Sequence, residues 1–362
     1  MKNNLLKTSA LVGSLFILGT SVSNAQTTIT GNLDISYRVL KNDLASKKID
    51  NFQGFGKESQ INIQNKGKLS NGMDYAAGFS LEFDGNDTAS TTAGGGGDLA
   101  GALSGENVYI DLISGNTTFT FGADHIQNPD THAHINPAGV GYITSYTAGT
   151  AGIYPTAANS VYGSYGLGVV QKVPNVGSLS FNWVPNPKFG TSNIAGTVGP
   201  DIGNAATVSH YDGVEGVTYE VGFVGDFGVK GLSVMAFKVQ EQDQQDAGTK
   251  KVSGYRVGGS YNFGDMTVGL DKTQTTGSTD VQVNGKAASL TFAATKELSL
   301  GATYGKADKT AGTADEKIKL ISLGYNLGPV VLNATVRDVE NIGGVTTNGD
   351  SRDAIVKLST KF

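Results

Sequence analysis

The chain has 362 residues, among them 51 glycines and no cysteine, and its formal net charge is −5. Without cysteine, neither a disulfide framework nor a thiolate metal site is possible, and the scattered glycines have no collagen-like period. A mildly acidic chain is also a poor nucleic-acid binder, so no nucleic-acid partner is expected.

Residues 1–25 have the pattern of a secretory signal peptide, with Lys2 and Lys7 ahead of an apolar run over 10–19. Ser23 and Ala25 are small residues at the positions that a signal peptidase reads, which predicts cleavage after Ala25. The apolar run is about half of the roughly 20 residues needed to cross a bilayer as a helix. We therefore expect an exported chain with a single domain over 26–362.

From residue 27 onward the dominant pattern has period two. Apolar Leu33, Ile35 and Tyr37, for example, alternate with polar Asp34 and Ser36. Alternation of this kind predicts strands with one apolar and one polar face. The predicted strands are 27–39, 58–69, 73–84, 105–113, 117–123, 160–173, 177–184, 214–226, 231–240, 252–263, 266–274, 286–295, 298–306, 317–327, 330–338 and 352–362.

The connections between these strands alternate in length. Short turns rich in glycine, asparagine and aspartate are expected at 70–72, 174–175, 264–265, 296–297 and 328–329. Long loops are expected at 40–57, 85–104, 124–159, 185–213, 241–251, 275–285, 307–316 and 339–351. Short turns at one rim and long loops at the other are typical of an outer-membrane barrel. The predicted fold class is all-β, a transmembrane antiparallel barrel of sixteen strands in the cell outer membrane, and its lipid bilayer is the expected surrounding.

Sixteen strands enclose a lumen that side chains cannot fill, which predicts a water-filled channel. The even strand number places both termini on the periplasmic side. The last strand, 352–362, ends on Phe362 with Ala354, Val356 and Leu358 on the same face. This ending resembles the C-terminal assembly signal of outer-membrane proteins, which implies the barrel assembly machinery as a partner.

The mature chain resembles the general porin family, the sixteen-stranded trimeric outer-membrane porins of Gram-negative bacteria, in its non-enteric proteobacterial branch. Tyr109-Ile110-Asp111-Leu112, followed by Phe119, Phe121 and Gly122, is similar to the fourth and fifth strands of that branch. Asn159-Ser160-Val161-Tyr162 resembles the start of its sixth strand. The resemblance implies a homotrimer, a third extracellular loop folded into each pore, and passive diffusion of small hydrophilic solutes and ions.

Two features depart from the family pattern. Ala123, followed by Asp124, stands where the family often has arginine after Gly122. The Pro-Glu-Phe-Gly-Gly loop signature of enteric porins is also absent. Charge selectivity is therefore not fixed by the resemblance.

The segment 124–159 is the longest expected loop and is the candidate pore constriction, because long loops of this kind are usually functional. Its candidate residues are Asp124, His125, Asp130, His132 and His134. The histidines allow a second interpretation as a metal-binding or pH-sensing site. Their spacing matches no structural zinc pattern, however, and polar lining of the pore mouth is preferred.

Charges on the inward phase are candidates for ion selection, because rings of charge bias permeation. The candidate pore-lining charges are Asp34, Arg38, Asp74, Glu82, Asp84, Asp111, Arg256, Asp271, Arg337 and Lys357. The loop contains carboxylates but no lysine or arginine, and removal of Lys2 and Lys7 leaves 25 basic against 32 acidic residues. These charges favour a weakly cation-selective channel.

Other classes of function receive less support. No Gly-x-Ser-x-Gly motif or other nucleophile motif accompanies the histidines, so neither an enzyme nor a cofactor is expected. A substrate-specific outer-membrane channel or a barrel-type surface adhesin remains the alternative. The predicted inward residues are mostly small or charged, without an aromatic track for sugars, which favours the general channel.

Overall fold

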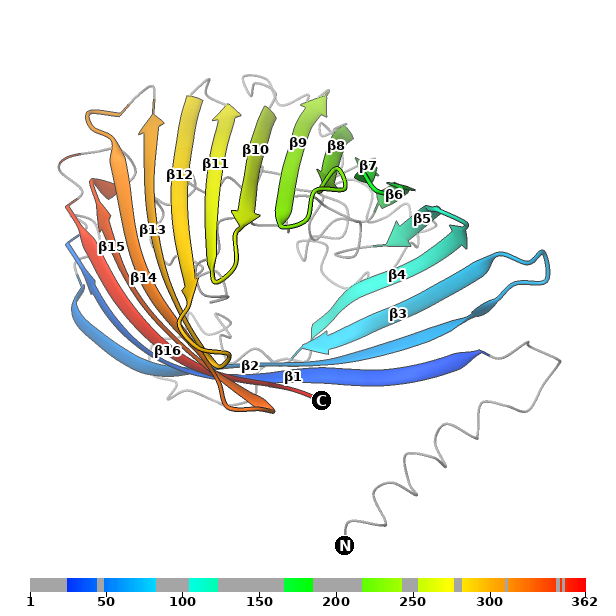
Figure 1. The fold of residues 1–362 in the computed structure, drawn as a ribbon, viewed down its shortest axis with the longest axis horizontal. Coiled ribbons are helices and arrows are strands. Elements are labelled where there is room, and N and C mark those ends of the chain that lie inside the picture. The colour runs from blue at the N-terminus through cyan, green and yellow to red at the C-terminus, as the bar shows by residue number, and fades with distance from the viewer. Residues whose placement is uncertain are drawn as a thin grey trace, which may run out of the picture.

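The computed structural model has sixteen strands that close into one antiparallel barrel (Figure 1). Every strand is hydrogen-bonded to its neighbour in sequence, and the ring closes where the first strand pairs with the last. The predicted fold class is therefore confirmed. The structure describes residues 25–43, 49–82, 104–122, 166–184, 217–242, 253–276, 282–309, 312–342, 346 and 349–362.

The observed strands agree with the expected ones to within a few residues at most ends. They are β1 (Gln26–Asn42), β2 (Ile49–Lys68), β3 (Asp74–Glu82), β4 (Ser104–Ser114), β5 (Thr117–Gly122), β6 (Gly166–Val173), β7 (Gly177–Val184), β8 (Val217–Gly225), β9 (Leu232–Gln242), β10 (Ser253–Asn262), β11 (Met266–Thr276), β12 (Gln282–Ala293), β13 (Leu298–Lys309), β14 (Glu316–Asn326), β15 (Val330–Glu340) and β16 (Ser351–Lys361).

The barrel is apolar outside and polar inside. On β1 the side chain of Ile35 is 49% exposed, and on β16 that of Leu358 is 45% exposed. The inward Asp353 of β16 and Arg337 of β15, in contrast, are 1% and 3% exposed. This distribution is the reverse of that in a soluble protein. It suits a sheet whose outer surface meets hydrocarbon.

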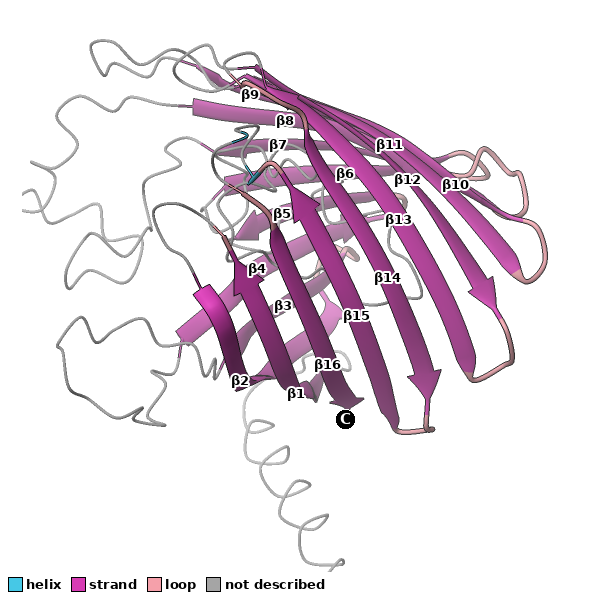
Figure 2. Cartoon of the chain, turned by 90° about the vertical axis from the view of Figure 1, so that its left-hand side faces the viewer, coloured by secondary structure: helices cyan, strands magenta, loops and turns pink. Residues whose placement is uncertain are grey.

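The short turns lie at the rim where the chain ends, as Figure 2 shows for the turns after β10, β12 and β14. Glycine adopts a positive φ in several of them, for example +86° at Gly72 and +90° at Gly328, a conformation that L side chains rarely adopt. Asparagine side chains complete these two turns. Asn71 Oδ1 accepts from the Met73 amide at 3.1 Å, and Asn326 Oδ1 accepts from the Gly328 amide at 2.8 Å.

The expected long loop 40–57 is wrong in its extent. β1 continues to Asn42 and β2 begins at Ile49, so only residues 43–48 connect them. Leu40 pairs with Phe52 and Tyr37 with Phe55, whose ring lies 5.1 Å from that of Tyr37. The residues before Lys57 show no polar and apolar alternation of their own. Backbone pairing with β1, rather than side-chain patterning, makes them a strand.

Several expectations fall outside the described residues. These are the signal peptide, apart from Ala25, the expected loops 124–159 and 185–213, nearly all of the expected loops 85–104 and 241–251, and the Asn159-Ser160-Val161-Tyr162 motif. In the part of the chain that the structure describes, no helix is both long and apolar enough to cross a bilayer.

Candidate functional site: the charged inner wall

The candidate charges lie on the face opposite to the exposed apolar side chains. Cross-strand register shows this directly. Asp34 of β1 lies opposite Ser359 of β16, and Asp111 of β4 lies opposite Ala76 of β3. In each pair both residues face the lumen. The residues placed on this inner face are Asp34, Arg38, Asp74, Glu82, Asp111, Arg256, Asp271, Arg337 and Lys357. Asp84 lies outside the described residues.

Asp353 joins two of the predicted bases. Its Oδ2 accepts from Arg38 Nη2 at 2.5 Å and from Arg337 Nη2 at 2.7 Å. Arg337 is directly opposite Asp353 in the register of β15 and β16, and Arg38 reaches it from β1 on the other side. The Asp353 side chain is fully buried. A buried carboxylate between two guanidinium groups is a strong charge-assisted arrangement, and it lies where the barrel closes.

Asp353 was missed from the sequence although the signal was present. The outward phase of the last strand contains Ala354, Val356 and Leu358, so Asp353 must face inward. Its position at the start of the strand concealed this, because strand ends are the least certain part of a sequence-based prediction.

Two further ion pairs bring predicted residues together. Lys357 Nζ donates to Asp34 Oδ2 at 2.8 Å between β16 and β1. On the neighbouring strands β10 and β11, Arg256 Nε donates to Asp271 Oδ2 at 2.5 Å, and both side chains are buried. The described basic side chains among the candidates therefore all contact a carboxylate on the same wall.

Three inner carboxylates accept hydrogen bonds from neutral side chains. The Thr120 hydroxyl donates to Asp111 at 2.7 Å, and the Gln60 amide donates to Glu82 at 2.9 Å. Glu220 of β8 accepts from the Asn182 amide of β7 at 3.0 Å. A neutral donor orients a carboxylate without cancelling its charge.

Glu220 and Asn182 were not predicted. Alternation could have identified both, because the adjacent residues Val221 and Phe181 face outward. β9, which pairs with β8, does not show its inward side so clearly, because its residues 234–237 are apolar on both faces. Its inward Met235, Phe237 and Val239 are all buried. The inner wall therefore also includes an apolar stretch that the expected small and charged lining did not anticipate.

The candidate constriction residues Asp124, His125, Asp130, His132 and His134 lie outside the described residues, so their arrangement is not part of this site. Among the residues that the structure does place, no group of three or more His, Cys, Asp or Glu side chains could hold a metal ion.

A closed sixteen-stranded barrel with an apolar exterior and a charged interior defines a transmembrane β-barrel channel. The family model described as Gram-negative porin matches residues 8–344, so the chain belongs to the Gram-negative porin family. It is an integral protein of the outer membrane and forms a porin channel there. A comparison with curated proteins gives no match.

Solved porin structures share the fold at low sequence identity. The anion-selective porin from Comamonas acidovorans is 15% identical, with a TM-score of 0.67 over 94% of this chain and 100% of that chain. The trimer form of OmpT from Vibrio cholerae is 14% identical, with a TM-score of 0.58 over 94% and 100%. A mutant of the Rh. blastica porin is 15% identical, with a TM-score of 0.56 over 93% and 100%.

Proposed function

We propose that the barrel is a general diffusion channel that passes small hydrophilic solutes and ions with a weak preference for cations. The inner-face charges line the pore, the segment 124–159 forms its constriction, and the channel performs no enzymatic reaction. The observation that carries this proposal is the pairing of charges on the wall. Arg38 and Arg337 contact Asp353, Lys357 contacts Asp34, and Arg256 contacts Asp271.

This pairing bears on the sign of the selectivity. A row of unpaired arginines would attract anions into the pore, but here each of these bases shares its field with a carboxylate. Asp111, Glu82 and Glu220 are further carboxylates of the inner wall, and each accepts a hydrogen bond from a neutral side chain. Asp124 and Asp130 add two more carboxylates in a segment without lysine or arginine. Fixed negative charge beside low-dielectric walls raises the local cation concentration.

The name of the Comamonas acidovorans porin states anion selectivity for that protein. At 15% identity the likeness shows a shared fold, and the selectivity of that porin does not transfer to this chain. The sign in this chain therefore follows from its own residues. Ala123 and Asp124 are the relevant pair, because the family resemblance puts arginine at the position of Ala123.

The test is the reversal potential of the purified channel in a planar bilayer under a potassium chloride gradient. We expect a value on the cation side that moves toward anions in the double variant Asp124→Asn and Asp130→Asn. The matched control is Asp226→Asn with Asp265→Asn, which removes two exposed carboxylates from short turns and should leave the value unchanged. An anion-side value in the unmodified protein would overturn the assignment.

The proposed assembly is a homotrimer, which the family resemblance implies and the trimer form of Vibrio cholerae OmpT supports. Mass measurement in mild detergent tests it, and a monomer at every protein concentration would contradict it. Solute flux into liposomes separates a general channel from a substrate-specific one. A general channel shows rates that rise linearly with solute concentration, whereas saturation by one solute would indicate a specific binding site.

A further inference from the structure

A row of lysines crosses the outer face of the barrel. Lys272 of β11 is directly opposite Lys286 of β12, which is opposite Lys306 of β13, which is opposite Lys317 of β14. All four have the phase of the exposed apolar residues Leu270, Leu290, Tyr304 and Ile321. Neighbouring strands are about 4.8 Å apart, so the row presents four like charges at short, regular spacing on the surface that meets lipid.

This arrangement is unfavourable by itself, because like charges directly opposite each other destabilise a sheet. Part of the row is compensated. Lys306 contacts Asp315 at 2.6 Å, and Lys317 lies 3.6 Å from Glu340, which Lys319 also contacts at 2.5 Å. Among the described residues, Lys272 and Lys286 contact no carboxylate, and Lys272 lies 6.0 Å from the centre of the Tyr255 ring. An external anion would therefore stabilise these two adjacent ammonium groups.

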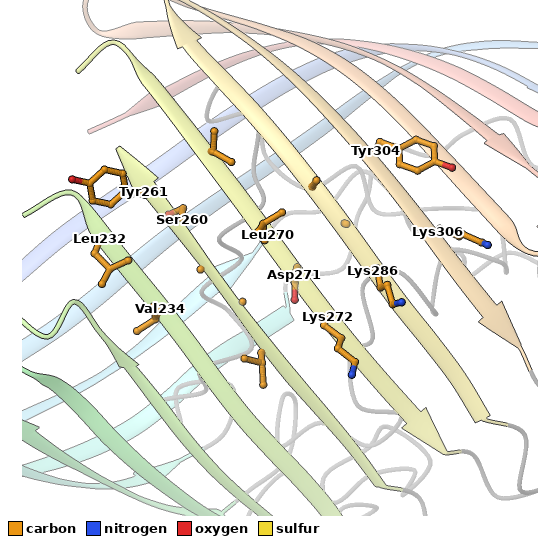
Figure 3. A pocket seen from close by; sticks show the side chains of 16 residues that line it. Leu232, Val234, Ser260, Tyr261, Leu270, Asp271, Lys272, Lys286, Tyr304 and Lys306 are labelled. Carbon is orange, nitrogen blue, oxygen red and sulfur yellow. The ribbon is translucent and has the colours of Figure 1, made fainter. Parts of the chain in front are cut away.

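An apolar groove adjoins the same lysines. It has a volume of about 880 Å³ and lies on the outer face across β9 to β13. Figure 3 shows Lys272, Lys286 and Lys306 toward one end, with Leu232 and Tyr261 toward the other. Gly259 contributes a depression to the groove, and a larger residue would fit poorly there, because a Cβ would come within 3.0 Å of the Ser233 carbonyl oxygen. The remaining outward lining is mainly aliphatic, with Val234, Val257, Val268 and Leu270.

The lysines occupy the outer end of the groove. They lie toward Thr276 of β11 and Gln282 of β12, away from the short turns at 263–265 and 294–297. In an outer-membrane barrel the short turns face the periplasm. The lysine end of the groove therefore lies toward the external surface, at the depth where lipid headgroups meet acyl chains.

We propose that this groove and the lysine row bind a phosphate-bearing lipid of the outer leaflet. Its phosphate lies against Lys272 and Lys286, and an acyl chain lies along Val257, Leu270 and Val234. Charge complementarity selects an anion, because the only carboxylate of the lining, Asp271, faces inward and contacts Arg256. The apolar length below the cations selects a lipid over free phosphate. Basic residues at a membrane surface attract anionic lipids in this way.

The experiment measures binding of lipid A to the purified full-length protein in detergent by native mass spectrometry, with dephosphorylated lipid A as the paired probe. We expect the phosphorylated form to bind at least tenfold more tightly. The double variant Lys272→Ala and Lys286→Ala should lose that preference, and the double arginine variant should retain it. The control variant Lys230→Ala with Lys296→Ala removes two lysines from short turns and should bind as the unmodified protein does.

A second variant tests the groove separately from the cations. Ala288→Phe places a ring in the groove between the strands that carry the lysines and should weaken lipid A binding while leaving the charges in place. Equal binding of both lipid A forms, or unchanged binding by the double alanine variant, would overturn the proposal. Full competition by equimolar inorganic phosphate would also overturn it. If the double alanine variant lost its oligomers but kept its lipid, the lysine row would be a contact between copies of the chain, which would overturn the proposal as well.

Discussion

The ring of Phe362 lies against the backbone of Gly31. A Cβ on Gly31 would come within 2.4 Å of Phe362 Cζ, so glycine makes room for the ring. The same two residues exchange backbone hydrogen bonds, Gly31 N to Phe362 O at 2.9 Å and Phe362 N to Gly31 O at 3.0 Å. Their contact is the lower end of the seam between β1 and β16, where the barrel closes. An aromatic ring covering a glycine on the neighbouring strand stabilises that register.

Gly31→Val should weaken the closure of the barrel. The branched side chain would displace the Phe362 ring and also approach the Gln60 carbonyl oxygen, which is 2.6 Å from the position of a Cβ. Overpacking of this kind costs about 1–3 kcal/mol. Thermal unfolding in detergent, followed by the gel shift between folded and unfolded barrel, measures it. Ala302→Val introduces the same side chain at an exposed position on β13 and should unfold at the temperature of the unmodified protein.

Deleting Phe362 should reduce the amount of barrel in the outer membrane, because it removes both the ring and the backbone pairing with Gly31. Phe362→Ala keeps the backbone and removes only the ring. An aromatic assembly signal predicts that both variants insert poorly. If Phe362→Ala inserts normally and the deletion does not, backbone pairing rather than ring recognition is what assembly needs. Normal levels of the deletion variant would refute the assembly role of this residue.

The strands could be predicted because each one has one face toward lipid and one toward the lumen, so that apolar and polar residues alternate along it. Apolar and polar residues alternate along most of β13 and β16, and the predicted ranges overlap the observed strands almost entirely. The start of β2 could not be predicted, because residues 49–57 owe their strand conformation to β1 and not to their own side chains. The apolar inner face of β9 is a similar case. Where consecutive residues are all apolar, as over 234–237, the sequence does not indicate which side chains face inward.

Partial removal of 124–159 should raise single-channel conductance, because a constriction loop limits the cross-section of the pore. The physical reason is that conductance follows the narrowest part of a water-filled channel. Shortening 185–213 by the same number of residues is the matched control and should leave conductance unchanged. Equal conductance of the unmodified and the 124–159 variant would place that loop outside the pore.

The candidate site could be predicted residue by residue but not pair by pair. Inward phase follows from alternation alone, which identified Arg38, Arg337 and Lys357. Their partners depend on the register between strands far apart in sequence, such as Arg38 with Asp353 across the β1–β16 seam. Inward phase alone would therefore allow these bases to form a basic wall. The structure instead shows these bases in contact with carboxylates, which changes the expected field in the pore.

Asp353→Asn should affect both stability and selectivity. It leaves the half-buried Arg38 and the buried Arg337 without their shared carboxylate, and breaking a buried ion pair costs about 3–5 kcal/mol. The loss of one negative charge from the wall should also move the reversal potential toward anions, and the shift should shrink at 1 M salt, where screening acts over about 3 Å. Thermal unfolding and bilayer recording measure the two effects on the same preparation.

Asp338→Asn is the control for Asp353→Asn, because it breaks an ion pair between the same two strands on the opposite face. Arg352 Nε donates to Asp338 Oδ1 at 2.5 Å, but the Arg352 side chain is 71% exposed. The pair lies near the external end of β15 and β16, where an exposed ion pair contributes little to stability, and its outward position keeps it away from the lumen. Asp338→Asn should therefore unfold close to the unmodified protein and leave the reversal potential unchanged. Equal shifts in the reversal potential for Asp338→Asn and Asp353→Asn would mean that wall position does not determine which charges the permeating ions sense.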